Sequence, residues 1–478
     1  MLLIILFSLL GIFLVYKSIE FYGPLMSPDS IYYLQTAENF KNGYGISIRD
    51  ADGLKAMTHW APLYPVMLSF FNNFKILNVI LSFITSFLIG VIILRATNSI
   101  YASILSVILF SFSPTYIFIF SHLWSETLSI PFILITIIFI KKYLDSQKIQ
   151  FLIIFSILIA ISTLIRYANL FFILAIMLIF FIYRFKVLHL IISLFISSSL
   201  FILWQIRNSL SPNPQATREF SLHIFSSAHF SVLLETLKNY VLPPYSESWQ
   251  FIIMISLLLG IIMFLISRKE NVRFSNWEKM LLICAISVII FLFISISTMD
   301  YYTLPDIRIL SPFFIFTFCF LFIFVYKILH FKLNGILIYL ALLLGYVNYT
   351  FSYINEVREN PSDLNSPIWS NLEIIKELKK LPSNSYIYTN APDIIYLHTK
   401  HFASMIPRKY NPVNNKLEYD FKDEIREMEM KLKKNDGFLV IIYPFSRFYL
   451  PTKDELEHLI PLEVYKETRD GIIYKVRK

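Results

Sequence analysis

Long apolar segments constrain this 478-residue chain more than any other feature of its sequence. Segments long enough to cross the ~30 Å hydrocarbon core of a bilayer recur throughout residues 1–352. We predict eleven transmembrane helices, at residues 2–17, 76–94, 98–120, 126–140, 150–165, 168–183, 187–205, 249–267, 280–297, 309–326 and 335–352. The sequence thus indicates a mainly α, polytopic membrane protein, and a hydrophobic content of 56% excludes an ordinary soluble enzyme.

The first apolar segment carries targeting information. No basic residue precedes residues 2–17 and no small-residue cleavage site follows them, so we expect a retained signal anchor. The two cysteines, Cys284 and Cys319, both fall inside expected spans. They therefore do not form a disulfide framework.

The distribution of basic residues predicts an orientation. If the N-terminus is cytoplasmic, the cytoplasmic loops hold twelve Lys and Arg residues, whereas the short outer loops hold only Arg166 and Arg308. We predict a multi-pass protein of the cell membrane with a cytoplasmic N-terminus and an extracytoplasmic C-terminal tail. Because this asymmetry accounts for the net charge of +9, we expect no nucleic-acid partner.

Three segments outside the expected spans share the outer face of this topology. They are residues 18–75, residues 206–248 and the tail. The composition changes abruptly to a soluble pattern where the tail begins. We therefore predict a transmembrane domain over residues 1–352 and a C-terminal soluble α/β domain over residues 353–478.

The tail contains recognisable signals for the ends of secondary-structure elements. Ser366 and Pro367 begin a helix that we expect to reach residue 381. Thr452 and Glu455 form a capping box. The other expected elements are a strand at 385–390, a helix at 421–434, a strand at 437–443 and a hairpin that turns at 469–471.

Four ionisable side chains stand at or near the outer ends of expected spans: Asp29, Glu126, Arg166 and Arg308. An ionisable group at membrane depth costs roughly 2.5–3.5 kcal/mol, so its placement is informative. Each also has a structural explanation, because acids suit the first turn of a helix and arginines can extend to the membrane interface. Asp306 is close enough in sequence to pair with Arg308.

Asp29 lies at the start of a helix that we expect at residues 28–42, with Ser27 as its N-cap. The mixture of apolar and aromatic residues in this helix predicts an interfacial helix on the bilayer surface. The following segment "THWAPLYPVML" (58–68) returns the chain to the membrane. Its two prolines favour a fixed, extended path over a regular helix.

The polar residues near the outer ends of the spans could bind either a divalent metal or a phosphate. Glu126 follows His122 by four residues, and such a pair could ligate a divalent metal, although no third ligand is apparent. Arginine has a fixed fork of donors that matches phosphate. Two arginines beside two carboxylates near the outer leaflet therefore predict a site for a lipid-linked phosphate. In the tail, His398 and His401 are expected at the surface.

The order of several short motifs resembles that of the GT-C glycosyltransferases, membrane enzymes that use polyprenyl-phosphate sugars, and especially their bacterial protein-mannosyltransferase and aminoarabinose-transferase branch. The motifs are "PDSIYYLQTAENFKNGYG" and "HWAPLYP" in the first outer loop, then "WSETLSIPF", "LIRYANL" and "DIRILSP", with a looser match at "IYTNAPDIIYLHTK". The resemblance spans most of residues 1–352 and implies a GT-C-like fold.

The resemblance also implies roles for individual residues. The first-loop acid of the family is its catalytic carboxylate, which assigns that role to Asp29, and Glu126 matches a second acid. Arg166 and Arg308 would bind the donor phosphate. The other residues expected to bind substrate are Tyr32, His59 and Trp60.

Three features of the sequence differ from those of some members of the family. The chain has "WAP" where the family often has two prolines after the tryptophan. Ser30 stands beside Asp29 where some members have a second acid, which argues against the eukaryotic protein-mannosyltransferases. The "WWDYG" signature of oligosaccharyltransferases is absent, so we do not expect en bloc transfer of a glycan to asparagine.

The expected reaction moves a sugar from a polyprenyl-phosphate donor to a glycan, lipid or protein acceptor on the extracytoplasmic face. One carboxylate base and direct displacement at the anomeric carbon would invert the anomeric configuration. The residues demand no cofactor, and a divalent metal is left as an option. The alternatives are a lipid or solute transporter or flippase, for which inverted repeats and midplane polar residues would be typical, and a non-catalytic scaffold that displays its tail.

Overall fold

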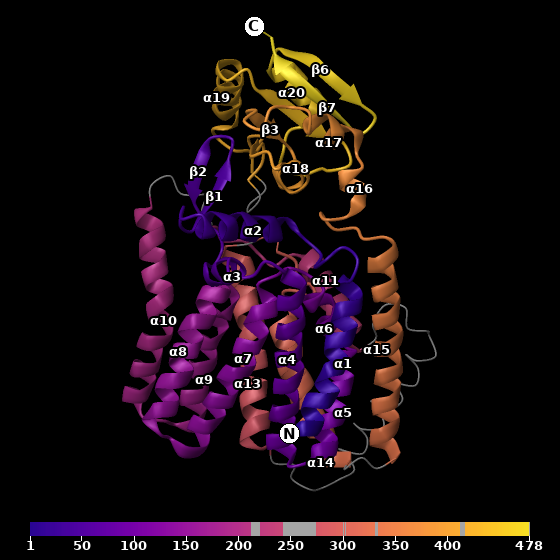
Figure 1. The fold of residues 1–478 in the computed structure, drawn as a ribbon. Coiled ribbons are helices and arrows are strands. Elements are labelled where there is room, and N and C mark those ends of the chain that lie inside the picture. The colour runs from indigo at the N-terminus through magenta and orange to yellow at the C-terminus, as the bar shows by residue number, and fades with distance from the viewer. Residues whose placement is uncertain are drawn as a thin grey trace.

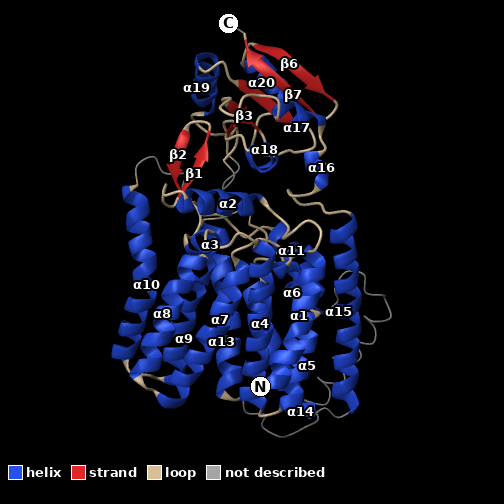
Figure 2. Cartoon of the chain, viewed as in Figure 1, coloured by secondary structure: helices blue, strands red, loops and turns tan. Residues whose placement is uncertain are grey.

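A computed structural model of the protein describes residues 1–211, 220–241, 274–299, 301, 303–329, 333–411 and 416–477. Long helices form a bundle, and the tail covers the end of the bundle away from the N-terminus (Figure 1). The strands all lie at that covered end (Figure 2). The expected fold class, a helical membrane protein with a small α/β tail, is confirmed.

The bundle contains seven described helices that are long and apolar enough to cross a membrane, and α5 with α6 makes an eighth if the pair counts as one span. The seven are α1 (Leu2–Ile19), α4 (Phe74–Thr97), α7 (Glu126–Ser146), α10 (Val187–Leu210), α13 (Asn276–Thr298), α14 (Ser311–Leu329) and α15 (Leu333–Glu359). Two shorter apolar helices, α8 (Ile149–Ile165) and α9 (Phe171–Tyr183), accompany them, and the 3-10 turn η1 (Tyr167–Leu170) precedes α9.

The expected count of eleven spans is not confirmed. Residues 98–120 form two helices, α5 (Ile100–Ser111) and α6 (Pro114–Phe120), which meet at 59°. The bend has a local cause, because Pro114 lacks a backbone N–H and Ser113 caps the new helix by accepting from the backbone N–H of Tyr116. The span expected at 249–267 lies outside the described residues.

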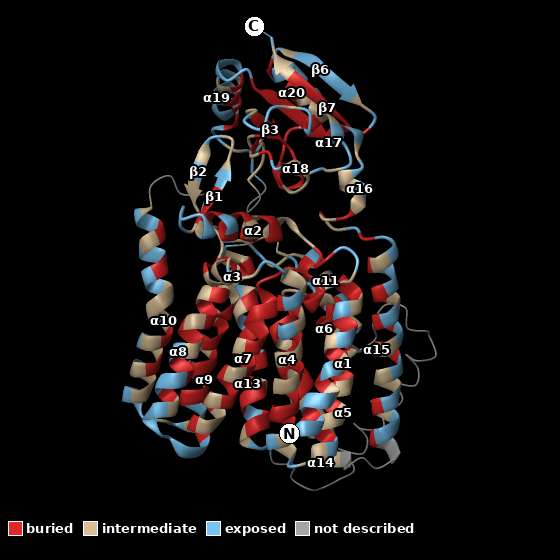
Figure 3. Cartoon of the chain, viewed as in Figure 1, coloured by how far each residue is buried: buried red, intermediate tan, exposed pale blue. Residues whose placement is uncertain are grey.

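Small residues let the helices of the bundle approach closely. A Cβ added to Gly90 of α4 would stand 2.6 Å from Ile4 of α1, and one added to Gly11 of α1 would meet the hydroxyl of Tyr116. Burial is highest in helices such as α4 and α7, whereas α10 and α15 are largely exposed (Figure 3). The apolar outer faces of α10 and α15 are therefore suited to contact lipid.

The tail folds into a five-stranded mixed sheet in the order β4-β3-β5-β7-β6. The strands are β3 (Ile387–Thr389), β4 (Ala403–Met405), β5 (Phe438–Ile442), β6 (Leu462–Thr468) and β7 (Gly471–Val476). β3 runs parallel to β4 and β5, and β7 runs antiparallel to β5 and β6. Every residue of the central strand β5 is buried, so this strand forms the middle of the core of the tail.

The helices of the tail are α16 (Pro367–Ser370), α17 (Glu373–Leu378), α18 (Pro392–Thr399), α19 (Phe421–Lys434) and α20 (Lys453–Leu459). The helix expected at 421–434 and the Thr452 capping box are confirmed. The single helix expected at 366–381 is instead broken into α16 and α17. The carboxylate of Asp470 accepts from the backbone N–H of Glu373 (2.7 Å) and of Ile374 (2.9 Å), which starts a new helix there.

Helix α2 (Pro28–Lys41) lies between the bundle and the tail (Figure 1). Its Ile31 belongs to the core of the tail, with Leu364 and Ile394. Its Tyr33 belongs to the core of the bundle and packs edge-on against Tyr64. The expectation of an interfacial helix on the bilayer surface was therefore wrong, because apolar residues on both sides of α2 are covered by protein.

The rest of the first outer loop also differs from the extended path that we expected. Residues 63–68 form helix α3 (Leu63–Leu68), with Pro62 as its N-cap and Pro65 in its first turn, where a helix needs no backbone N–H. A hairpin of β1 (Ser47–Asp50) and β2 (Gly53–Ala56) precedes it. Helix α11 (Ser227–Val241) lies in the second outer segment.

Candidate active site

Four segments converge where the end of the bundle that faces the tail meets α2 (Figure 1). Asp29 lies in the first turn of α2, behind the N-cap Ser27. Glu126 is the first residue of α7, and Arg166 follows the last residue of α8 in an extended conformation. Arg308 lies in the loop before α14. The structure thus brings together the four ionisable residues that stand far apart in the sequence.

The guanidinium of Arg308 bridges the two carboxylates. Its Nη2 lies 2.8 Å from Oδ2 of Asp29, and its Nε donates to Oε1 of Glu126 at 2.5 Å. Arg166 reaches the same Glu126 oxygen from its Nη1 at 2.9 Å. The four side chains therefore form one continuous ionic cluster with two positive and two negative charges.

Glu126 is the buried centre of this cluster, with a side chain that is 1% exposed. Its second oxygen, Oε2, accepts from the hydroxyl of Ser125 at 3.2 Å. A buried charge without partners would cost several kcal/mol, so the two arginines are what make an acid tolerable at this position. Glu126 in turn fixes the positions of both guanidinium groups.

Asp29 is the more accessible carboxylate, with a side chain that is 30% exposed. Its Oδ1 accepts from the indole N–H of Trp60 at 3.2 Å. Burial alone would raise the pKa of Asp29, but the guanidinium of Arg308, the nearby His59 and the Trp60 N–H together hold that pKa below its usual value. Asp29 is therefore ionised at neutral pH.

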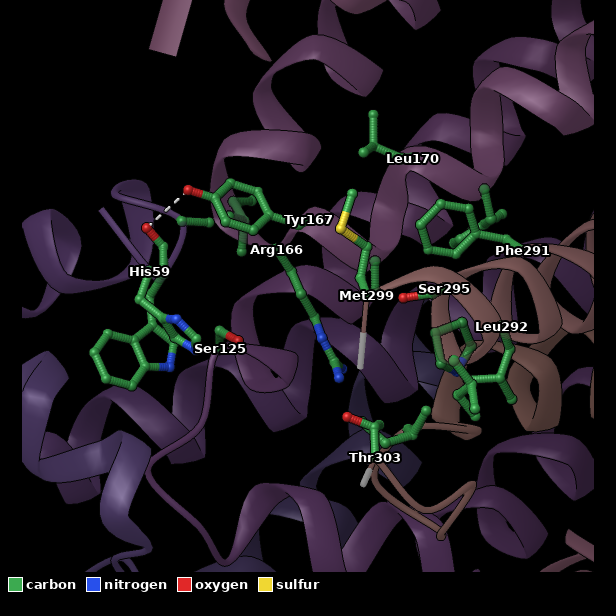
Figure 4. Close-up of a pocket in the computed structure, with 18 of the residues that line it drawn as sticks. His59, Ser125, Arg166, Tyr167, Leu170, Phe291, Leu292, Ser295, Met299 and Thr303 are labelled. Atoms are coloured by element: carbon green, nitrogen blue, oxygen red, sulfur yellow. Dashed lines mark hydrogen bonds between the residues drawn. The ribbon is translucent and has the colours of Figure 1, made fainter. Parts of the chain in front are cut away.

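Aromatic side chains hold Trp60 in place. Tyr32 stacks on its ring with centroids 4.6 Å apart, and His59 packs against it edge-on at 4.7 Å. The hydroxyl of Tyr167 donates to the backbone carbonyl of Trp60 at 3.0 Å, the dashed line in Figure 4. The indole N–H of Trp204 on α10 donates to that same hydroxyl at 2.7 Å.

A cavity of about 860 Å³ opens beside the ionic cluster. Its charged lining comes from Asp29, Arg166, Asp306 and Arg308. Its apolar lining comes largely from α13, with Phe201 from α10, and includes Phe291, Leu292, Ile296 and Met299. In Figure 4 the side chain of Arg166 extends into the cavity toward Thr303. The cavity thus combines a charged region with an extended apolar wall.

Most of the residues selected from the sequence border this cavity directly. Asp29, His59, Trp60, Arg166 and Arg308 line it, whereas Glu126 and Tyr32 support residues that do. One expected contact is not formed in the described structure: Arg308 pairs with the two carboxylates and not with Asp306. The Asp306 carboxylate accepts from the backbone N–H of Ile309 at 2.8 Å instead, and burial raises its pKa.

The histidines do not support the metal site considered from the sequence. His122 turns away from Glu126 and lies 3.0 Å from Asp363 at the start of the tail. Among the described residues, no group of three His, Cys, Asp or Glu side chains could hold a metal ion. His401 was expected at the surface but is buried, with its ring nitrogens at hydrogen-bond distance from Thr399 and Pro382.

Sequence analysis missed several residues of the site. Trp124 lies against Arg308, and Tyr167 and Trp204 support Trp60 from two different helices. Arg207, one turn after Trp204, donates to the backbone carbonyls of Ile46 and Met57 and so fixes the first outer loop. Trp124 and Tyr167 gave a signal in the sequence, because they lie inside the motifs that contain Glu126 and Arg166, whereas Trp204 and Arg207 gave none.

Comparison with solved structures identifies the fold. ArnT from Cupriavidus metallidurans, in a crystal structure bound to undecaprenyl phosphate, matches with a TM-score of 0.62 at 12% identity, over 98% of this chain and 97% of that chain. An oligosaccharyltransferase from Archaeoglobus fulgidus, in complex with Zn and sulfate, matches with a TM-score of 0.55 at 12% identity, over 99% of this chain and 73% of that chain.

Comparisons of the sequence itself gave no match. No protein-family model matches it, and no curated protein matches it. The structural matches nevertheless span the bundle and the tail together. The chain therefore shares its fold with ArnT and with the archaeal oligosaccharyltransferase.

Proposed function

We propose that this protein is a membrane glycosyltransferase that transfers a sugar from a polyprenyl-phosphate donor to an acceptor hydroxyl. The observation that carries the proposal is the guanidinium of Arg308, held between the carboxylates of Asp29 and Glu126 at the cavity. Such a transferase needs a cation for the leaving phosphate and a base for the attacking hydroxyl at one point. The ionic cluster contains both.

The shape and chemistry of the cavity support a polyprenyl-phosphate donor. Arg308 and Arg166 present guanidinium groups, whose donor geometry matches phosphate oxygens. The apolar wall, which comes mainly from α13, suits an isoprenoid chain, and the neighbouring α10 is itself largely exposed. The structural neighbour ArnT was solved with undecaprenyl phosphate bound, which is a ligand of the proposed class.

Binding of the donor would activate the base. Without a donor, the guanidinium of Arg308 holds the pKa of Asp29 below its usual value. A phosphate in the cavity competes for the same guanidinium and weakens its pair with Asp29. As that pair weakens, the pKa of Asp29 rises toward its ordinary value, and the carboxylate becomes a stronger base.

The proposed reaction is a single displacement. The acceptor oxygen attacks the anomeric carbon while the bond from that carbon to the phosphate oxygen breaks, and the electron pair of this bond leaves with the phosphate. The acceptor proton passes to Asp29. Arg308 and Arg166 stabilise the negative charge that collects on the leaving polyprenyl phosphate. Attack opposite the leaving group inverts the anomeric configuration.

Polar groups beside the ionic cluster are placed to orient the sugar. Thr58, His59 and Asn208 line the cavity. Within the described part of the chain, Nδ2 of Asn208 is buried without a hydrogen-bond partner, so a bound hydroxyl or phosphate oxygen would satisfy it. Tyr32 and Trp60 would form an aromatic platform for the sugar ring.

The proposal includes a direction across the membrane. The excess of basic residues on the other side of the bundle favours a cytoplasmic N-terminus and an extracytoplasmic cavity and tail. The acceptor, a glycan, lipid or protein, would then approach from outside the cell membrane. In this arrangement residues 1–352 form the catalytic domain, and residues 353–478 cover the site from above.

The experiment that tests the proposal is a transfer assay in proteoliposomes with an undecaprenyl-phosphate sugar. We expect Asp29→Asn to lower turnover by about 10²–10⁴-fold, the contribution typical of a general base. Asp145→Asn is the matched control, because Asp145 pairs with Lys141 near the opposite end of α7. Unchanged turnover in folded Asp29→Asn protein would overturn the proposal.

A further inference from the structure

Trp124 lies against the guanidinium of Arg308, with Cζ 4.6 Å from the centroid of the indole ring. The ring of His122 stacks on the same indole, with centroids 3.8 Å apart and planes inclined by 14°. A ring at that distance covers one face of the indole, which leaves the other face for the guanidinium. Trp124 is therefore held between His122 and Arg308, and a cation–π contact fixes the arginine.

Trp124 is also tied to the helix that carries Asp29. Its indole N–H donates to the hydroxyl of Ser27, the N-cap of α2, at 2.8 Å. The two segments are joined through their backbones as well: Leu25 donates to the carbonyl of Ser121 at 2.8 Å, and Leu123 donates to the carbonyl of Leu25 at 2.9 Å. The indole thus fixes the position of Arg308 relative to the first turn of α2.

His122 is anchored on two sides. Its Nδ1 lies 2.6 Å from the backbone carbonyl oxygen of Phe118, so Nδ1 carries the proton that it donates. Its Nε2 lies 3.0 Å from Oδ2 of Asp363. These two contacts hold the imidazole between Phe118 and Asp363, and the indole of Trp124 stacks on the imidazole held there.

Asp363 begins a short strap, residues 363–365, that connects α15 to the tail. Leu364 donates its backbone N–H to the carbonyl of Met26 at 2.9 Å, and the side-chain oxygen of Asn365 accepts from the backbone N–H of Met26 at 3.0 Å. The strap therefore contacts Met26, which precedes α2 and Asp29, and His122, which precedes Glu126.

Hydrophobic packing alone does not account for this arrangement. An apolar side chain at position 122 would fill the same space, whereas the buried His122 and the partly exposed Asp363 lose hydration when they pair. The pair ties the imidazole to residue 363, a link that an apolar side chain at position 122 would lack.

We infer that Trp124 is a positioning residue whose indole holds the guanidinium of Arg308 between the carboxylates, and that His122 and Asp363 hold the indole in turn. The inference rests on the proposed function, since it assigns these residues to the phosphate-binding geometry of that site. It also gives the strap a role, because the strap then sets the distance between the segment that precedes Asp29 and the segment that precedes Glu126.

The test measures binding of undecaprenyl phosphate to the purified full-length protein in detergent. His122→Gln keeps polar contacts but removes the ring that stacks on Trp124. We expect it to weaken binding about tenfold, a loss within the range of energies typical of cation–π contacts. His122→Phe keeps the ring but removes the pair with Asp363, and we expect a smaller loss of about threefold. Equal affinity of His122→Gln and the unmodified protein would overturn the inference.

Two additional proteins make the result unambiguous. His189→Gln is the matched control, because His189 contacts Tyr143 at the opposite end of the bundle, and its affinity should be unchanged. If His122→Gln does not fold, Trp124→Phe replaces it. That variant keeps an aromatic face but loses the N–H bond to Ser27, so we expect about threefold weaker binding; unchanged binding would contradict the inference.

A second measurement separates this inference from the proposed function. If the unmodified protein binds no undecaprenyl phosphate, the proposed donor is wrong, and a double-mutant cycle then decides about Trp124. The cycle compares the thermal unfolding of His122→Gln, Arg308→Gln and the double variant. Coupling through the indole predicts a combined loss smaller than the two separate losses together, and additive losses would overturn the inference.

Discussion

Neutralising Glu126 should destabilise the protein more than neutralising Asp29, although Arg308 contacts both carboxylates. In Glu126→Gln, two guanidinium groups lose the negative charge of a side chain that is only 1% exposed. Removing one partner of a buried ion pair costs about 3–5 kcal/mol. Because glutamine keeps one acceptor oxygen, we expect the lower end of this range, about 3 kcal/mol.

Asp29→Asn removes a charge from a different environment. The side chain of Asp29 is 30% exposed and pairs with Arg308, so solvent screens much of the interaction. Ion pairs that solvent reaches contribute about 0–1 kcal/mol, and we expect a loss of about 1 kcal/mol here. The two isosteric substitutions therefore differ in stability while they remove the same charge.

Thermal unfolding of both variants in one detergent measures the difference. At about 2 °C per kcal/mol for a large chain, Glu126→Gln should unfold about 6 °C below the unmodified protein and Asp29→Asn about 2 °C below it. Asp145→Asn is the control and should not shift, because the carboxylate of Asp145, which pairs with Lys141, is 52% exposed. Equal shifts for Glu126→Gln and Asp29→Asn would refute the burial-based reasoning.

Three other perturbations test separate contacts of the site. In Arg308→Lys, the lysine side chain lacks the planar fork that contacts both carboxylates, so turnover in proteoliposomes should fall by about 10²–10³-fold. The turnover of Arg308→Gln should fall at least as far. Trp60→Phe keeps the ring that stacks on Tyr32 but loses the N–H bond to Asp29, so turnover should fall about tenfold; an unchanged rate would show that this bond has no role. The pKa of Asp29 is lowered in the folded protein, so its ion pair stabilises the fold fully above the unfolded value of about 3.9 and is lost as the pH falls through the folded value. The difference in unfolding temperature between the unmodified protein and Asp29→Asn should therefore be constant from about pH 5 to 8 and should shrink below about pH 4.

Local patterns in the sequence predicted the elements that local physics determines. Thr452 and Glu455 cap α20 as expected, and the helix at 421–434 has the expected bounds, because capping and charge spacing act within a few residues. The four ionisable residues of the site could also be selected, since a charge near the end of an apolar span is conspicuous. Their roles remain proposals, whereas their convergence at one cavity is a feature of the structure.

Features that depend on distant contacts left no pattern in the sequence. Nothing near His122 indicates that its partner is Asp363, and nothing in α2 indicates that Ile31 enters the core of the tail. The break between α16 and α17 depends on Asp470, which is remote in the sequence. The bend at Pro114 was different, because the proline was visible but the surrounding apolar residues favoured one continuous span.

Native mass spectrometry of detergent-purified Asp29→Asn protein, expressed in cells that make polyprenyl-phosphate sugars, tests the central claim most directly. The proposed mechanism predicts that this variant retains an intact polyprenyl-phosphate sugar, because the base that starts transfer is missing while Arg166 and Arg308 still bind the phosphate. The mass of the lipid would identify the donor. A folded Asp29→Asn sample that carries no such lipid and gains none on addition of the donor would contradict the claim.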